Sequence, residues 1–153
     1  MSTYPQPPNP RAYYELVWEI VRQVPRGAVT TFGQIASMIP PPEGVEAGDY
    51  ERLAPRWVGD AMNAVSRIDD PSIPWHRVIN SKGGISLPED SISAAQQRAR
   101  LRLEGLLDDH ERVDLNSHGW EGPDDDWRKE HGFRPPKPLR KPPPEDAGQL
   151  RLF

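Results

Sequence analysis

The side chains of this 153-residue chain that could bind a ligand or react are most concentrated in seven consecutive residues, Ile73-Pro74-Trp75-His76-Arg77-Val78-Ile79. They place a proline, an indole, an imidazole and a guanidinium directly before two β-branched residues. An indole and a guanidinium can both stack on flat ligands, and an imidazole can transfer protons near neutral pH. The alternative is a buried tryptophan followed by a strand, because tryptophan usually belongs to a core. The sequence around these residues favours a functional site over that alternative.

The absence of cysteine limits what such a site can do. It excludes disulfides, thiolate metal ligands and a cysteine nucleophile. The run Asp124-Asp125-Asp126 suggests a metal site at first sight, but three consecutive carboxylates point in different directions on any regular element. We therefore expect no metal, no cofactor and no transfer of an alkyl group to sulfur.

Two further blocks precede the heptapeptide, Gly27-Ala28-Val29-Thr30-Thr31-Phe32-Gly33-Gln34-Ile35-Ala36 and Arg56-Trp57-Val58-Gly59-Asp60-Ala61-Met62. In this order, the three blocks resemble the DNA-binding and active-site domain of O6-alkylguanine-DNA alkyltransferases. The signature of that family is Pro-Cys-His-Arg-Val, in which the cysteine accepts the alkyl group. Trp75 stands at the cysteine position here. The chain thus resembles an alkyltransferase-like protein, and the resemblance covers residues 13–107.

This resemblance implies a site that receives a base flipped out of the duplex. Arg56 falls on the family's arginine finger, the side chain that takes the place of the extruded nucleotide. The alternatives for Arg56 are an ordinary phosphate contact or a surface charge. Phe32 and Trp75 are expected to line the pocket, and the family usually has tyrosine where Phe32 lies. Val78 and Ser86 are weaker candidates for the pocket wall.

The resemblance also assigns positions to His76, Arg77 and Glu104. In the alkyltransferases, a histidine activates the thiol through a water and a glutamate of the last helix, and His76 and Glu104 match these two residues. Because this chain has no thiol to activate, we expect His76 and Glu104 to form a buried structural pair. Arg77 is expected to brace the same motif.

Helical periodicity and capping residues predict the first elements that position these side chains. Asn9 and Pro10 open a helix that runs to about residue 23, with asparagine as N-cap and proline in the first turn. Thr31 and Gln34 have the spacing of a capping box and begin a second, short helix. A third helix is expected over residues 55–66, so that the second and third form a helix-turn-helix.

The remaining elements complete the predicted fold. A last helix opens near Asp90 or Ser93 and ends at Glu104, with a buried stripe of Ala95, Ala99 and Leu103 and a solvated side that carries Arg98, Arg100 and Arg102. Residues 77–86 are typical of a β-hairpin around a glycine turn. The predicted fold class is mainly α with a short β-hairpin: a winged helix-turn-helix-like DNA-binding domain plus an extended Pro-rich C-terminal tail.

The chain is expected to have three parts. Residues 1–107 form the alkyltransferase-like DNA-binding domain, and residues 108–133 form an acidic extension partly docked on it, with Trp120 and Trp127 as the docking side chains. Residues 134–153 form a tail whose prolines predict a semi-rigid, polyproline-like spacer.

The tail ends in Gln149-Leu150-Arg151-Leu152-Phe153. This segment resembles the bacterial sliding-clamp-binding motif Gln-Leu-(Ser/Asp)-Leu-Phe at four of five positions. An apolar terminus on a polar tail usually has a partner, so Gln149, Leu150, Leu152 and Phe153 are candidate clamp contacts. The alternative is that the tail folds back on its own domain.

Charge and hydropathy indicate the kind of partner. The chain has a formal net charge of −4, but residues 1–107 contain 11 Lys+Arg and 12 Asp+Glu and are nearly neutral. We therefore expect weak binding to undamaged DNA and recognition through a lesion. No stretch approaches the roughly 20 apolar residues of a membrane span. A monomeric, cytoplasmic, nucleoid-associated protein is expected.

These observations predict a non-enzymatic DNA-damage sensor. It would flip and bind O6-alkylguanine in duplex DNA and mark it for nucleotide-excision repair, without alkyl transfer. One alternative is a winged-helix regulator without lesion specificity, in which Trp75 is only a core residue. Another is a residual enzyme that uses His76 as nucleophile or base, which would need activation of the imidazole.

Overall fold

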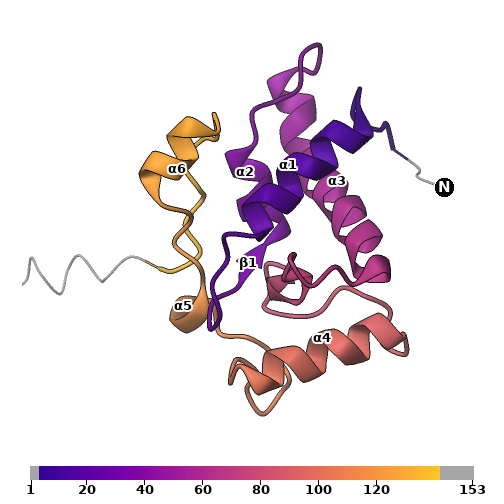
Figure 1. The fold of residues 1–153 in the computed structure, drawn as a ribbon, viewed down its shortest axis with the longest axis vertical. Helices are drawn as coiled ribbons and strands as arrows, with labels where there is room; N and C mark the ends of the chain where they lie inside the picture. Colours follow the sequence, from indigo (N-terminus) through magenta and orange to yellow (C-terminus); the bar gives the residue numbers. More distant parts are fainter. Residues whose placement is uncertain (1–3, 142–153) are drawn as a thin grey trace, which may run out of the picture.

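The computed structural model describes residues 4–141. Its first three helices, α1 (Pro10–Val21), α2 (Phe32–Met38) and α3 (Ala47–Ile68), pack against one another, and α4 (Ile92–Leu103) lies across one end of this group (Figure 1). Two strands of two residues each, a 3-10 turn and two short helices complete the described chain: β1 (Thr30–Thr31), η1 (Trp75–Arg77), β2 (Val78–Ile79), α5 (Leu115–His118) and α6 (Asp125–Glu130). The expectation of a mainly helical fold is confirmed.

Side-chain caps set the start of α1, α2 and α4. The Asn9 side chain accepts a hydrogen bond from the Ala12 N–H, and Thr31 accepts one from the Gln34 N–H, as predicted. The cap of α4 is Ser91, not Asp90 or Ser93. Each of these caps satisfies a backbone N–H that the first turn of a helix leaves without a partner.

Helix α3 begins eight residues before the predicted start at Pro55 and runs unbroken over 22 residues. The buried side chains before and after Pro55 share one face of the helix: Tyr50, Leu53, Ala54, Trp57, Val58, Ala61 and Met62. Packing of this continuous face outweighs the loss of one N–H donor at the proline. The predicted start at residue 55 was wrong because the residues before Pro55 belong to the same buried face of the helix.

The predicted β-hairpin over residues 77–86 is not formed. Strand β2 instead pairs in parallel with β1, with Thr30 opposite Val78 and Thr31 opposite Ile79. After β2 the chain turns, and the Gly83 carbonyl accepts a hydrogen bond from the Val113 N–H at 2.8 Å. Gly83 has a φ of +82°, and a Cβ there would lie 2.2 Å from the Val113 carbonyl oxygen. The glycine therefore serves a close backbone approach to a distant segment, and residues 81–86 form no strand that could pair with β2 as a hairpin.

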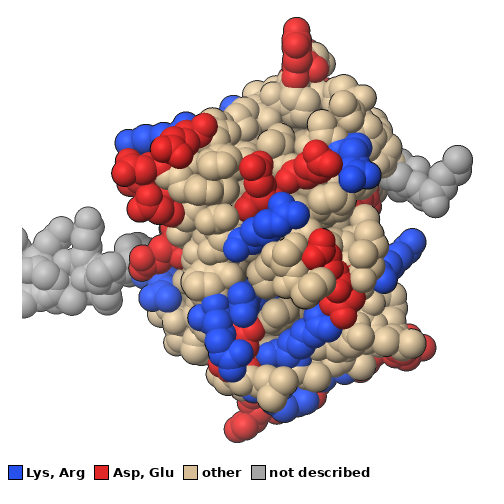
Figure 2. All heavy atoms as spheres, viewed as in Figure 1, with Lys and Arg blue, Asp and Glu red and all other residues tan. Residues whose placement is uncertain are grey.

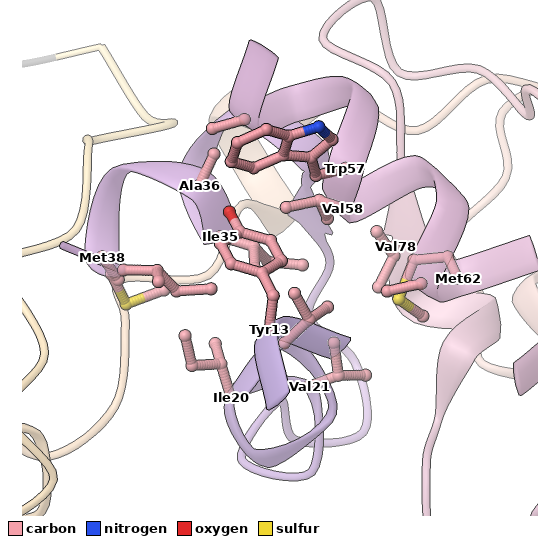
Figure 3. Packing of buried hydrophobic residues seen from close by; sticks show 14 of the residues in the cluster. Tyr13, Ile20, Val21, Ile35, Ala36, Met38, Trp57, Val58, Met62 and Val78 are labelled. Carbon is pink, nitrogen blue, oxygen red and sulfur yellow. The ribbon is translucent and has the colours of Figure 1, made fainter. Parts of the chain in front are cut away.

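The main core lies between α1, α2 and α3. Figure 3 shows Tyr13 of α1 beneath Trp57 of α3, and their ring centroids are 5.4 Å apart in an edge-to-face arrangement. Val58 and Met62 continue this core from α3, and Val78 joins it from β2 (Figure 3). Because Val78 shares the core with α3, the segment that carries Trp75 is fixed against that helix.

The segment after α4 packs on the same core. Trp120 and Phe133 are buried in it, and the partly buried Trp127 packs against it. The Trp120 N–H also donates to the Val29 carbonyl at 2.8 Å. The residues Gln149 to Phe153 lie outside the described part of the chain. Among the described helices, none is long and apolar enough to cross a membrane.

Candidate nucleic-acid interface

A pocket of about 180 Å³ opens between α3, η1 and the segment after β2. Four of the predicted site residues line it together: Phe32, Trp75, Val78 and Ser86. The other lining residues were not predicted from the sequence, and they are Pro55, Gly59, Met62, Asn63, Ser66, Leu87 and Gln97. The pocket wall is thus aromatic and aliphatic on α2, α3 and η1, with a few amide and hydroxyl groups, a composition suited to a flat organic ligand.

Trp75 opens η1 and is both a core residue and part of this pocket wall. Its side chain is only 3% exposed. The indole Nε1–H donates to the Asp69 Oδ1 at 2.9 Å, and the Arg100 guanidinium carbon lies 5.2 Å from the ring centroid. Trp75 therefore packs in the core and also lines the pocket.

Asp69 and Arg100 hold this indole in place and were not predicted as site residues. Asp69 ends α3 in the left-handed conformation, with a φ of 54°. Arg100 binds its carboxylate with both guanidinium NH groups, at 2.8 and 2.7 Å. The hydrogen bonds from Arg100, followed by that from Trp75, hold the pKa of Asp69 well below its usual range.

Arg100 was missed because the buried face of α4 was assigned incorrectly. The predicted stripe of Ala95, Ala99 and Leu103 is wrong, and Leu103 is 77% exposed. The buried residues are instead Ala94, Gln97 and Leu101. Glutamine at the centre of an otherwise apolar stripe is the signal that was overlooked, because its amide donates to the backbone carbonyls of His76 and Val78.

Glu104 lies at the centre of a second hydrogen-bonded cluster behind the pocket. Its carboxylate is 2.6 Å from the His76 Nε2 and 3.0 Å from the Arg77 Nε, and it accepts a 2.8 Å bond from the Gly27 N–H. Arg77 also donates to the Val24 carbonyl at 2.9 Å. The cluster therefore ties the loop before α2, the heptapeptide and the end of α4 together.

Burial and hydrogen bonding set the charge of this cluster. Burial alone would raise the pKa of Glu104, but Arg77, the Gly27 N–H and His76 outweigh it and lower that pKa. Burial lowers the pKa of His76 despite the attraction of Glu104. An ionised carboxylate only accepts hydrogen bonds, so His76 donates through Nε2. Its Nδ1 is buried without a hydrogen-bond partner among the described residues.

A pH-dependent stability follows from the lowered pKa of His76. The unfolded chain binds a proton at this imidazole below its ordinary pKa of 6.5, whereas the folded chain binds it only at lower pH. Because the unfolded state holds more protons in this window, the free energy of unfolding falls as the pH drops below about 6.5. The slope from one such group is at most about 1.4 kcal/mol per pH unit. Denaturant unfolding between pH 7.5 and 5 measures it.

The variant His76→Gln is expected to flatten that slope, because glutamine does not titrate. His110→Gln is the matched control, since His110 is exposed. Equal slopes for wild type and His76→Gln would contradict the assignment of this pH-dependent stability to His76.

Arg56 lies on the exposed side of α3 and does not line the pocket. Its neighbours Pro55 and Gly59 do, so the side chain begins at the rim. Its guanidinium carbon is 5.3 Å from the centre of the Tyr4 ring. The Tyr4 hydroxyl in turn donates to the Asp60 carboxylate at 2.9 Å. The chain before α1 thus stacks an aromatic ring against Arg56 on the surface.

Gly59 keeps the pocket open at the middle of α3. A Cβ at this position would meet no atom within 4 Å. Gly59→Ala is therefore expected to raise the free energy of unfolding by about 0.5–1 kcal/mol through helix propensity, while its methyl group narrows the pocket. If the pocket receives a flipped base, as the sequence resemblance implies, the affinity for that base should fall although stability rises. Gly48→Ala, also in α3 with open space around it, is the control, because Gly48 lies outside the pocket lining. Unchanged affinity of Gly59→Ala for a flipped base would contradict that expectation.

Comparison with known proteins identifies the family. A family model described as the DNA-binding domain of 6-O-methylguanine DNA methyltransferase matches residues 12–106. Alkyltransferase-like protein 1 of Schizosaccharomyces pombe is 39% identical over 92 residues, which cover 60% of this chain and 72% of that protein. The DNA base-flipping protein of Escherichia coli strain K12 is 31% identical over 110 residues, which cover 71% of this chain and 74% of that protein.

A solved structure agrees with these matches. The crystal structure of S. pombe Atl1 in complex with damaged DNA containing O6-carboxymethylguanine aligns with a TM-score of 0.52 and 30% identity. The alignment covers 72% of this chain and 95% of that one. The chain belongs to the family of the 6-O-methylguanine DNA methyltransferase DNA-binding domain, in which its relatives place it among the alkyltransferase-like proteins. The resemblance and the winged helix-like fold inferred from the sequence are thereby confirmed.

Proposed function

We propose that this chain is a non-enzymatic sensor that flips O6-alkylguanine out of duplex DNA, binds it and marks it for nucleotide-excision repair. The observation that carries the proposal is the pocket beside Arg56, in which Trp75 occupies the acceptor position of a chain without cysteine. The relatives named as base-flipping proteins, and the Atl1 complex with damaged DNA, support a lesion as the ligand.

The chemistry of the pocket fits the binding of a flipped purine. Phe32 and Trp75 provide aromatic surface, and stacking of a base on such a side chain contributes about 1–3 kcal/mol. Arg56, at the rim, has a planar guanidinium that can fill the gap left in the duplex. His76 binds Glu104, which also accepts hydrogen bonds from Arg77 and the Gly27 N–H, so we assign His76 and Glu104 a structural role.

The surface charge supports recognition through the lesion. Figure 2 shows acidic and basic side chains interspersed over one face of the molecule. Binding to undamaged DNA depends mostly on contacts between cations and phosphates, and a mixed surface makes few of them. A DNA-bound sensor of this kind would be nucleoid-associated in the cytoplasm.

The proposal is tested with two matched duplexes, one of which contains a single O6-methylguanine. Fluorescence anisotropy at near-physiological salt should show at least tenfold tighter binding of the damaged duplex, which is about 1.4 kcal/mol. The intact mass of the protein after incubation should stay unchanged, because no alkyl group is transferred. Equal affinities would favour a winged-helix regulator, and a gain in mass would favour a residual enzyme.

The sequence of the last five residues, Gln149 to Phe153, supports a second proposal, recruitment by the sliding clamp. Their match to the sliding-clamp motif at four of five positions supports docking on a bacterial clamp, which would bring the sensor to replicating DNA. In a pull-down with purified clamp, Leu152→Ala/Phe153→Ala should abolish binding. Arg151→Ser, which restores the fifth position, should keep or strengthen it. Undiminished binding of the double variant would contradict docking of this segment on the clamp.

Coupling to excision repair has its own test. Purified damage-recognition proteins of that pathway should be retained on the damaged duplex more strongly when the sensor is present. Retention that does not depend on the sensor would contradict the marking step, while lesion binding itself would stand.

A further inference from the structure

We propose that residues 134–141 form a basic arm that contacts the DNA phosphates flanking the lesion, as an addition to the family's DNA-binding domain. The inference rests on the proposed function in taking DNA as the ligand. The family match ends at residue 106, so this segment lies outside it. Its eight residues include four cations and no carboxylate: Arg134, Lys137, Arg140 and Lys141.

The backbone of the arm is fastened to α2. The Arg134 N–H donates to the Met38 carbonyl at 2.7 Å, and the Lys137 N–H donates to the Ser37 hydroxyl at 2.9 Å. The Lys137 carbonyl accepts a 2.9 Å bond from the amide of Gln34, which is fully buried. These anchors use main-chain groups of the arm, so the arm keeps its place while its cationic side chains remain exposed.

The arm borders the lesion pocket through a second hollow. This hollow, of about 440 Å³, lies between α2, the first half of α3 and the arm, and Arg134 and Lys137 form part of its lining. Pro55 lines both hollows, and Gly33 in the second directly follows Phe32 in the first. A duplex that presents a base to the lesion pocket therefore passes next to the arm.

The charges around this second hollow favour an anionic partner. Glu51 is the one carboxylate among its described lining residues, against the two cations of the arm. Within residues 4–141, no ion pair joins Arg134, Lys137 or Lys141 to an acidic side chain. Arg140 donates through Nε to the Gly119 carbonyl, which is a neutral group. Cations without local partners are available to phosphates.

The arm also supplies positive charge that the preceding part of the chain lacks. Residues 1–107 carry a formal net charge of −1, so this part of the chain has no excess of cations to bind the phosphates of DNA. The stretch from 108 to 133 is acidic, with 3 Lys+Arg against 9 Asp+Glu. The cations of the arm follow that acidic stretch and return to the face of α2 and α3, where the phosphates of a bound duplex would lie.

Salt dependence of DNA binding tests the arm in the full chain. The double variant Arg134→Ala/Lys137→Ala should make the slope of log K against log salt shallower by about 1.8, from about 0.9 per lost phosphate contact. Between 50 and 200 mM salt, its affinity should fall about tenfold less than that of wild type. Lys137→Gln alone should reduce the slope by about 0.9. Because the anchors are main-chain groups, thermal unfolding should remain near that of wild type.

The control removes the same charge elsewhere. Arg26→Ala/Arg102→Ala deletes two cations at the end of α4, where Arg26 contacts the Leu103 carbonyl and Arg102 pairs with Glu111. Its slope should equal that of wild type, and an arm variant with the slope of this control would overturn the proposal. If wild type binds the damaged and undamaged duplexes equally well, the proposed function is refuted instead. The arm is judged by the slope on both duplexes, so the two failures are distinguishable.

Discussion

Replacement of Trp75 by alanine is expected to lower the free energy of unfolding by about 3–5 kcal/mol. The ring is 3% exposed and belongs to the main core, so its removal leaves a cavity next to α3. It also removes the Nε1–H bond to Asp69 and the ring under Arg100. Denaturant unfolding measures the loss, and a change below 1 kcal/mol would contradict a tightly packed Trp75.

Two milder variants separate the proposed binding role of Trp75 from its role in folding. Trp75→Phe keeps an aromatic wall, whereas Trp75→Leu keeps an apolar side chain without a π face. We expect Trp75→Phe to retain most of the lesion preference. Trp75→Leu should lose about 1–3 kcal/mol of lesion binding, or roughly 5- to 150-fold in affinity. Equal lesion affinities for these two variants would rule out stacking on residue 75.

The second large effect is expected at Glu104, where glutamine should lower the free energy of unfolding by about 3 kcal/mol. The side chain of Glu104 is 4% exposed, and that of Arg77 beside it is 15% exposed. Without the carboxylate, the Arg77 charge stays buried without an ionic partner, and the bond to His76 loses its charge assistance. The consequence should appear in the denaturant midpoint at pH 7.

Glu111→Gln provides the comparison, because Glu111 also pairs with arginines but is 53% exposed. Exposed ion pairs contribute little, so this variant should unfold close to wild type. If Glu104→Gln were no more destabilising than Glu111→Gln, the cluster would not hold the heptapeptide in place.

The features that the sequence predicted well are those set by neighbouring residues. The caps at Asn9 and Thr31 follow from short polar side chains directly before helical periodicity. The grouping of Phe32, Trp75 and Val78 in one pocket came from a resemblance between motifs, which carries long-range information that periodicity lacks.

The features that it missed depend on contacts between distant segments. Strand β2 pairs with β1 nearly fifty residues earlier, and nothing local in residues 77–86 distinguishes that pairing from a hairpin. The pairing of Arg100 with Asp69 depends on which face of α4 is buried, and the small alanines of that helix made the stripe ambiguous. The early start of α3 depends on tertiary packing across Pro55.

Lesion discrimination by Arg56→Ala and Arg52→Ala is the most direct test of the proposed flipping mechanism. Both arginines are exposed on α3, one turn apart, and both variants lose one positive charge. The quantity to measure is the ratio of affinities for duplexes with and without one O6-methylguanine. We expect Arg56→Ala to reduce a ratio of ten or more to near one, while Arg52→Ala leaves it unchanged. A ratio that falls equally in both variants, or in neither, would contradict the assignment of Arg56 as the residue that replaces the flipped base.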